Sequence, residues 1–304
     1  GEILAEIAAS DPRLKVVPGV PLPAGWLGKN HAIHQGVRHA GGDWLLFLDA
    51  DGELLPGCLS AAMADAAASE ADLFTLVPTL VNGSFWEQVV HPVLMMGIFA
   101  LFPRDQIGDP DSKVASANGP FMLFRRAAYE KIGGHEGVRG DIVEDLTLAR
   151  KIKEAGLRLR YVSAPTLMRV RMYKSLREIW NGWSKNFYAG AGESLLGVLL
   201  GTVLALLFGA GPWLLWPIGL AALLLGGWNA ALFGAVLAGG TATLACVGFR
   251  LVLAKYQDPP TPRLWLQPLA VFILIGILWN SALRTRFGGG ISWKGRTYAG
   301  GQAS

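Results

Sequence analysis

The sequence has few cysteines, and they are far apart. Its 304 residues include only Cys58 and Cys246, which excludes a scaffold held together by disulfide bonds. No secretory signal peptide is visible either. Because Gly1 is not a natural start and the first residues resemble the middle of a helix, we expect the native N-terminus to be missing.

Charge is absent from two long stretches in the last third of the chain, residues 194–249 and 264–283. A spanning helix needs about 20 apolar residues to cross a hydrocarbon core of roughly 30 Å, so the first stretch is too long for one crossing. With breaks expected at 209–212 and 226–229, we predict two to four spans within 194–284. The four-span version uses residues 195–209, 213–227, 229–251 and 265–283.

Acidic residues are almost absent after Glu193, where only Asp258 opposes seven bases. Residues 1–193 have a small negative net charge, so the alkaline isoelectric point of about 9.1 belongs to the membrane-associated part. We therefore predict no nucleic-acid binding. With 52% hydrophobic residues and a mean hydropathy of +0.36, the composition also indicates a membrane component.

The tail at 285–304 is basic, which by the positive-inside tendency places it in the cytoplasm. The stretch before Glu193 is basic too, so an even number of crossings is favoured. Lys255 and Arg263 oppose the four-span version, because their loop would then face outward.

Residues 1–168 alternate short apolar runs with helical patterns. This alternation predicts an α/β domain built on a mostly parallel sheet. The expected strands are 14–17, 44–48, 73–78, 121–124 and 157–162. The expected helices are 30–40, 56–68, 126–132 and 144–155.

Two carboxylates, Asp49 and Asp51, end the apolar run of residues 43–52, DWLLFLDADG. At the carboxyl end of an interior strand they would lie where α/β sheets bind ligands. Their oxygens suit Mg2+ or Mn2+, with sites left open for a diphosphate. A simple turn is the alternative. An EF-hand is excluded, because the glycine and glutamate it requires are Leu54 and Ser60 here.

Two apolar segments do not fit a plain soluble domain. Residues 92–103 are too short to span, so they form either a core helix or one lying in the membrane interface. In residues 169–193 we expect an amphipathic interfacial helix, because apolar and aromatic side chains share one helical face with lysine and arginine beside them. That face consists of Met172, Leu176, Ile179, Trp183 and Phe187.

A second acidic pair, Glu144-Asp145, begins a helical pattern after a turn-rich stretch. Acids are common in a first helical turn for electrostatic reasons alone. In combination, however, the chain resembles the family 2 inverting glycosyltransferases with a GT-A fold, especially the membrane-bound ones that glycosylate carotenoids, hopanoids or ceramide. The matching segments, in the order of that family, are residues 21–36, 45–52, 117–156, 171–186 and 291–298.

The resemblance implies a nucleotide-diphospho-sugar transferase domain that moves a sugar, a hexose, onto a lipid hydroxyl at the cytoplasmic face of the inner membrane. Asp49 and Asp51 would form the DxD motif that binds a divalent metal and the donor diphosphate, with a UDP-sugar the simplest donor. Of the acidic pair, Asp145 would be the base that activates the acceptor, with Glu144 beside it. Lys29 would contact the donor phosphates, although a solvated loop lysine is the alternative.

Several histidines and aromatic residues are less specific. His31, His34 and His39 could suggest a metal cluster, but no cysteine or acid completes a ligand set nearby, so we expect them to decorate one helix. His135 could line the acceptor site, or be an ordinary turn residue.

The chain departs from the family in two ways. Many members carry Q-x-x-R-W after the catalytic helix, whereas this chain has only Arg177-x-x-Trp180 and then Trp183 as acceptor or interfacial residues. The N-terminal strands that bind the base of the donor are not in the sequence. Two alternatives therefore stay open: a processive polysaccharide synthase, or a catalytically silent membrane subunit that binds a nucleotide sugar.

Overall fold

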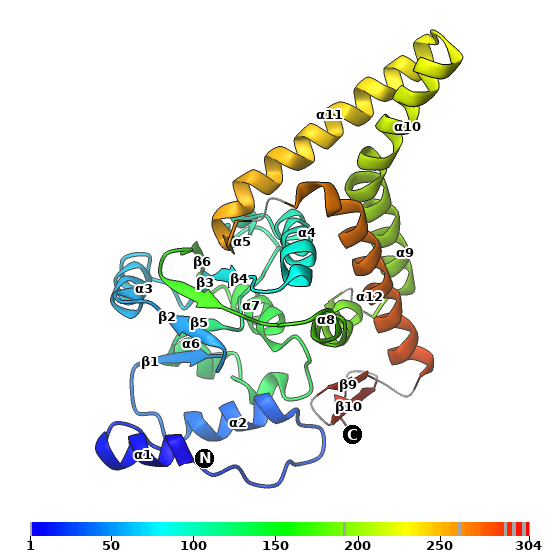
Figure 1. Cartoon of the computed structure of the whole chain (residues 1–304). Coiled ribbons are helices and arrows are strands. Elements are labelled where there is room, and N and C mark those ends of the chain that lie inside the picture. The colour runs from blue at the N-terminus through cyan, green and yellow to red at the C-terminus, as the bar shows by residue number, and fades with distance from the viewer. Residues whose placement is uncertain are drawn as a thin grey trace.

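The computed structural model describes residues 2–190, 193–260, 263–288, 291–293, 296–299 and 302–303. It places an α/β domain beside a group of long apolar helices (Figure 1). The main sheet has the order β1-β5-β3-β6. Its strands are β1 (Trp44–Leu48), β5 (Phe121–Arg125), β3 (Leu73–Val77) and β6 (Leu159–Ser163).

The α/β class is confirmed, but the main sheet is mixed where we expected a mostly parallel one. β5 is antiparallel to both β1 and β3, while β3 and β6 are parallel. β1, β3 and β6 thus run in one direction, and β5 is inserted against them. In this register Phe121, which begins β5, lies opposite Leu48, which ends β1. The turn before β5 is therefore brought to the carboxyl end of β1.

A second four-stranded sheet has the order β2-β7-β4-β8. Its strands are β2 (Gly52–Leu54), β7 (Met168–Val170), β4 (Thr79–Val81) and β8 (Gln257–Asp258). β8 lies in sequence between α11 (Ala230–Leu253) and α12 (Gln267–Phe287), yet it pairs with β4 of the α/β domain. The strand expected at 14–17 does not form, since those residues have no ladder partner.

Helices cover the main sheet, and the expected ones are present within a few residues. The expected helices correspond to α2 (Gly28–Val37), α3 (Cys58–Ala68), α6 (Arg126–Lys131) and α7 (Glu144–Glu154). The structure adds α1 (Glu2–Ser10), α5 (Arg104–Gly108) and the short 3-10 helix η1 (Glu136–Val138). Apolar side chains of α7 and β5 share one core cluster with Tyr129. That packing holds the start of α7 at the sheet edge where β1 ends.

For residues 92–103 the structure supports the core helix only over Pro92–Met95, which are buried, whereas Gly97, Ala100 and Leu101 are exposed. Helix α4 (Phe85–Leu101) begins earlier than expected, at a capping box in which Ser84 and Glu87 satisfy each other's backbone N–H groups. Its first half is buried, from Glu87 to Met95. Arg171 pairs with the buried carboxylate of Glu87 and fastens α4 to the chain before α8.

The amphipathic helix is also present, as α8 (Leu176–Gly190), but its apolar face points inward. Ile179, Trp183 and Phe187 pack in one cluster with residues of α4 and α12. The ring of Trp180 lies against Gly276 of α12. The stripe read as a lipid-facing anchor is therefore a helix-packing face, because α12 covers it.

Within the part of the chain that the structure describes, three apolar helices are long enough to cross a membrane. The first, Leu195–Gly226, is continuous and comprises α9 (Leu195–Leu204), a π-helical turn η2 (Ala205–Ala210) and α10 (Gly211–Gly226). The four-span version is wrong, since the expected break at 209–212 is this π turn. The turn expected at 226–229 does form.

The second and third long helices are Ala230–Tyr256 and Leu264–Phe287. The second contains α11 (Ala230–Leu253) and η3 (Ala254–Tyr256), and the third contains η4 (Leu264–Leu266) and α12 (Gln267–Phe287). Three short strands follow: β9 (Ile291–Trp293), β10 (Arg296–Ala299) and β11 (Gln302–Ala303). Part of the basic tail, including Lys294, lies outside the described residues.

Candidate active site

Four segments far apart in sequence bring their polar side chains to the end of β1. Lys29 lies in the first turn of α2, Asp49 follows β1, and Glu144 and Asp145 begin α7. Gly119, in the turn before β5, lies between them. A Cβ atom at Gly119 would lie 3.3 Å from Asp145 Oδ2, 3.4 Å from Lys29 Nζ and 3.7 Å from Asp49 Oδ2. The two predicted acidic motifs therefore face one space rather than separate cavities.

Lys29 is the electrostatic centre of this group. Its Nζ lies 2.8 Å from Asp49 Oδ1 and 2.7 Å from Glu144 Oε1, so it joins the two acidic motifs directly. Burial alone would lower the pKa of Lys29, but the charges of Glu144 and Asp49 outweigh it and hold the pKa well above its usual value. Lys29 therefore stays cationic, and it lies in a helix with two ion pairs to the acids rather than alone in a loop.

Asp145 has the properties of a general base. Burial, reinforced by the negative charge of Glu144, raises its pKa to about 6, although Lys29 and two backbone N–H groups act in the opposite direction. Those N–H groups belong to Gly119, which donates to Oδ2 at 3.1 Å, and Leu146, which donates to Oδ1 at 2.8 Å. They fix the carboxylate in place. A base with a pKa near neutrality is ionised at physiological pH and can still accept a proton.

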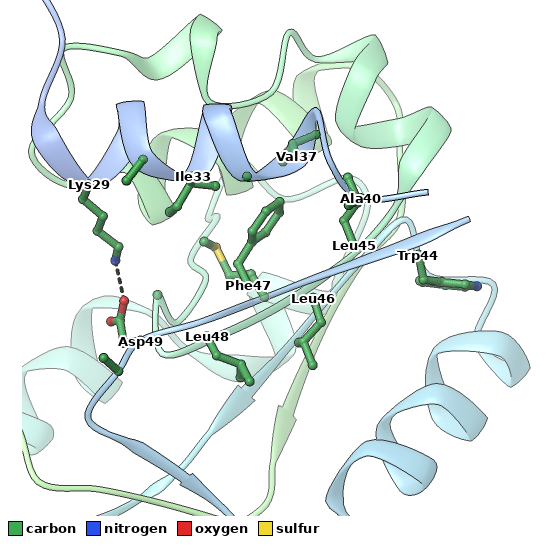
Figure 2. A pocket seen from close by; sticks show the side chains of 15 residues that line it. Lys29, Ile33, Val37, Ala40, Trp44, Leu45, Leu46, Phe47, Leu48 and Asp49 are labelled. Atoms are coloured by element: carbon green, nitrogen blue, oxygen red, sulfur yellow. Dashed lines mark ion pairs between the residues drawn. The ribbon is translucent and has the colours of Figure 1, made fainter. Parts of the chain in front are cut away.

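A cleft of about 540 Å3 opens beside this group, between α2 and β1 (Figure 2). Lys29 and Asp49 lie at one end, joined by their ion pair, and most of the lining is apolar. β1 borders the cleft because it is the edge strand of its sheet. The volume and the mostly apolar lining with few polar groups are typical of small-molecule sites.

The chemistry of the donor set fits a hard divalent cation. Asp49 and Asp51 offer carboxylate oxygens at the end of β1, the ligand type that Mg2+ and Mn2+ prefer. Among the described residues, no group of three or more His, Cys, Asp or Glu side chains gathers to hold a metal. Two protein carboxylates would therefore need ligands from elsewhere, and the oxygens of a bound diphosphate are of the right kind.

The predicted histidines are engaged in packing. His135 is fully buried, with its ring against Phe47 and Tyr129, and its backbone N–H donates to the Tyr129 hydroxyl at 2.9 Å. Burial lowers the pKa of His135 to about 3, so it is neutral. Its side chain therefore offers no surface to an acceptor, and the predicted role of His135 in lining the acceptor site is not supported. His31 and His34 lie on α2 and pack against Trp26, which precedes the helix, whereas His39 lies in the turn after it, so the prediction of one shared helix holds for two of the three histidines.

The three residues expected to contact an acceptor or the membrane interface do not reach the acidic group together. Trp180 and Trp183 pack against the α12 side of α8, and Arg177 is exposed. Their roles stay predictions.

Sequence reasoning missed two residues that face the site from the α8 side. Burial, together with the negative charges of Asp51 and Asp49, raises the pKa of Tyr173. Burial lowers the pKa of Lys185, which also feels Glu144, Lys29, Asp145 and Asp49. Lys185 had been read only as one of the basic residues on an amphipathic helix. The signal that could have found it is a lysine lying between the aromatic positions Trp183 and Phe187 of that helix.

Comparison with known proteins shows which sequences and structures the chain is similar to. Residues 1–133 match the sequence profile of Glycosyl transferase family 2. It is 25% identical over 182 residues to the 4,4'-diaponeurosporenoate glycosyltransferases of Staphylococcus aureus strains MRSA252 and USA300. The match covers 59% of this chain and 48% of each relative, so the chain spans about half the length of the curated relatives it matches.

Among solved structures, one similar chain is a mannosyltransferase, PcManGT from Pyrobaculum calidifontis, in complex with GDP-Man and Mn2+. The superposition covers 94% of this chain and 74% of that chain, with a TM-score of 0.47 and 17% sequence identity.

Proposed function

We propose that this chain is a membrane-bound inverting glycosyltransferase that moves a hexose from a nucleotide-diphosphate sugar to a lipid hydroxyl at the cytoplasmic face. The observation that carries the proposal is the convergence of Lys29, Asp49 and Asp145 around Gly119, at the mouth of a cleft of nucleotide size. The carotenoid acceptor named for the relatives favours a lipid acceptor here.

The donor would lie with its nucleotide part in the apolar cleft and its diphosphate at the Lys29 end. Lys29 stabilises the departing charge as a fixed cation, and Lys185 adds a second cation from the α8 side. A divalent metal bound by Asp49 and Asp51 would stabilise the same charge as a Lewis acid. A UDP-sugar is the simplest donor.

Asp145 takes the proton from the acceptor hydroxyl as its oxygen bonds to the anomeric carbon. The bond from that carbon to the diphosphate breaks in the same displacement, so the configuration inverts and no covalent enzyme intermediate is needed. Glu144 keeps the pKa of Asp145 high, and Gly119 and Leu146 hold its carboxylate still.

The test is transfer from a panel of radiolabelled UDP- and GDP-sugars into lipid extracts by membranes that contain the protein, with mass spectrometry of the products. We expect one lipid to gain a single hexose. A ladder of sugars would indicate a polysaccharide synthase instead. Binding of a nucleoside diphosphate with Mn2+ in calorimetry, without transfer of sugar to any lipid, would indicate a catalytically silent subunit that binds a nucleotide sugar.

A further inference from the structure

Three helices could cross a membrane by length and composition, yet an odd number of crossings would separate the two flanks of this region. The segment that follows α11 indicates which of the three helices cross. β8 pairs with β4, with Leu80 opposite Gln257, and the backbone N–H of Asn82 donates to the carbonyl of Asp258 at 2.7 Å. The chain has thus returned to the α/β domain when α11 ends.

The first two helices therefore form a hairpin whose two ends are both at the domain. α10 and α11 pack along each other and project away from the sheets, with the turn at Gly226–Asn229 at their far end (Figure 1). Close packing is possible because Gly219 and Gly239 face Val236 and Trp216.

The exposed surface of this hairpin is apolar. Leu215, Ile218, Leu224, Leu225 and Leu244 are each at least 65% exposed, and no residue between 211 and 246 is charged. A surface of this kind is stable only in a hydrocarbon environment. Trp228, 75% exposed at the tip, is a residue type enriched where a membrane meets water.

The third long helix, α12, lies along the domain. At its start, Arg263 contacts Gln88 and lies over the ring of Phe85, the residues that open α4. Towards its end, Asn280 Nδ2 donates to Ser184 Oγ at 2.8 Å, and Ser281 Oγ accepts from the backbone N–H of Tyr188 at 3.0 Å.

α8 is not a spanning helix, since it carries Arg177, Glu178 and Lys185, and α12 runs beside it. After α12 the chain forms β9, which lies beside α8 again (Figure 1). Both ends of α12 are therefore held at the domain.

Helix length agrees with this arrangement. The continuous helix Leu195–Gly226 has 32 residues, about 48 Å at 1.5 Å per residue, which exceeds a hydrocarbon core of roughly 30 Å by about 12 residues. The surplus corresponds to α9. This helix and the π turn η2 run antiparallel to α12, since Trp279 Nε1 donates to Thr202 Oγ1 in α9 and Gln267 Nε2 donates to the Gly209 carbonyl in η2. Crossing then begins near the π turn η2.

From these observations we infer that the chain inserts into the lipid bilayer through a single helical hairpin, residues 205–250, and that α12 does not cross. This inference rests on the membrane location in the proposed function. It also places five bases that follow Glu193 on one side, in agreement with the positive-inside tendency: Arg250, Lys255, Arg263, Arg284 and Arg286.

The test is sided cysteine labelling in vesicles with a membrane-impermeant maleimide, in a protein whose Cys58 and Cys246 are replaced by alanine. Single cysteines are introduced by Leu59→Cys on the domain, Trp228→Cys at the tip and Phe287→Cys at the end of α12, all exposed positions. We expect Phe287→Cys to label from the same face as Leu59→Cys, and Trp228→Cys only from the opposite face.

Labelling of Phe287→Cys from the tip face would show that α12 crosses and would overturn the inference. So would labelling of Trp228→Cys from the domain face, or its labelling only after detergent, which would indicate a re-entrant hairpin. Transferase activity is assayed on the same vesicles. A failure of the proposed reaction would therefore leave the labelling result interpretable.

Discussion

The active-site cleft and the α10–α11 hairpin use charge and burial in opposite ways. At the cleft, Lys29, Asp49, Glu144 and Asp145 crowd into a partly shielded space, where neighbouring charges contribute to the pKa shifts of Lys29 and Asp145. The hairpin has no charged residue from 211 to 246 and exposes its leucines. Activity at the cleft should therefore be sensitive to the loss of a single charged group. The stability of the hairpin should be sensitive to small changes of side-chain volume where its helices touch.

The largest expected effect is at Asp145. Asp145→Asn removes the base while keeping the shape of the side chain, and we expect transfer to fall by about 10^2 to 10^4-fold. Radiolabelled transfer in membranes measures it, and the control is Asp111→Asn on an exposed loop. Equal turnover in both variants would remove Asp145 from the reaction.

The next effect concerns the metal and the donor. Asp51→Asn should weaken metal-dependent binding of a nucleoside diphosphate and lower transfer by about a hundredfold, since a cation's charge stabilisation is worth several kcal/mol. Chelation should do the same to the unaltered protein, and Mn2+ should reverse it. Calorimetry is the measurement, with Glu53→Gln as the exposed control two residues away. A loss confined to the control would contradict the DxD assignment.

Lys185 tests whether the site extends to α8. Lys185→Met should lower transfer by about tenfold, the approximate worth of one charged hydrogen bond, and Lys185→Arg should restore part of it. Lys174→Met, an exposed lysine just before α8, is the matched control. The affinity for nucleoside diphosphate should fall with the rate; a fall in thermal stability alone would indicate a purely structural lysine.

The pH dependence follows from the raised pKa of Asp145. The carboxylate is ionised and active above its pKa, so the rate should be lost as pH falls through about 6, by about tenfold per unit below it. Glu144→Gln removes a charge that raises this pKa, so the acid limb should move to lower pH by about one unit or less. Glu154→Gln, exposed at the other end of α7, should leave the limb in place. A limb that stays near 6 in Glu144→Gln would contradict the coupling.

The smallest expected effect concerns side-chain volume between the two helices of the hairpin. A Cβ at Gly239 would lie 2.8 Å from Trp216 Cβ, whereas a Cβ at Gly234 would meet nothing within 4 Å. Gly239→Ala should therefore lower the free energy of unfolding by about 1 to 3 kcal/mol, while Gly234→Ala should leave it unchanged or raise it slightly. Thermal unfolding in detergent distinguishes them. Equal midpoints would show that the helices do not pack this closely.

Local patterns were enough for most elements of the domain and for the candidate site. The run that forms β1, the helical pattern after Glu144 and the turn at 226–229 follow from side-chain periodicity over a few residues. The strand directions in the main sheet were harder to predict, because the direction of β5 depends on the long segment containing α4 that precedes it. The strand expected at 14–17 also failed, since an apolar run forms a strand only if another strand is there to pair with it.

Residue order alone established an α/β domain followed by apolar helices, and singled out Asp49, Asp51, Asp145 and Lys29, because their chemistry is carried by short motifs. Tertiary packing decided the rest. It turned the aromatic face of α8 inward, enclosed His135, brought Lys185 towards the acids and returned β8 to the domain. The physical reason is that burial and ladder pairing depend on contacts between segments distant in the chain, and no local pattern records which partner a face or a strand edge will meet.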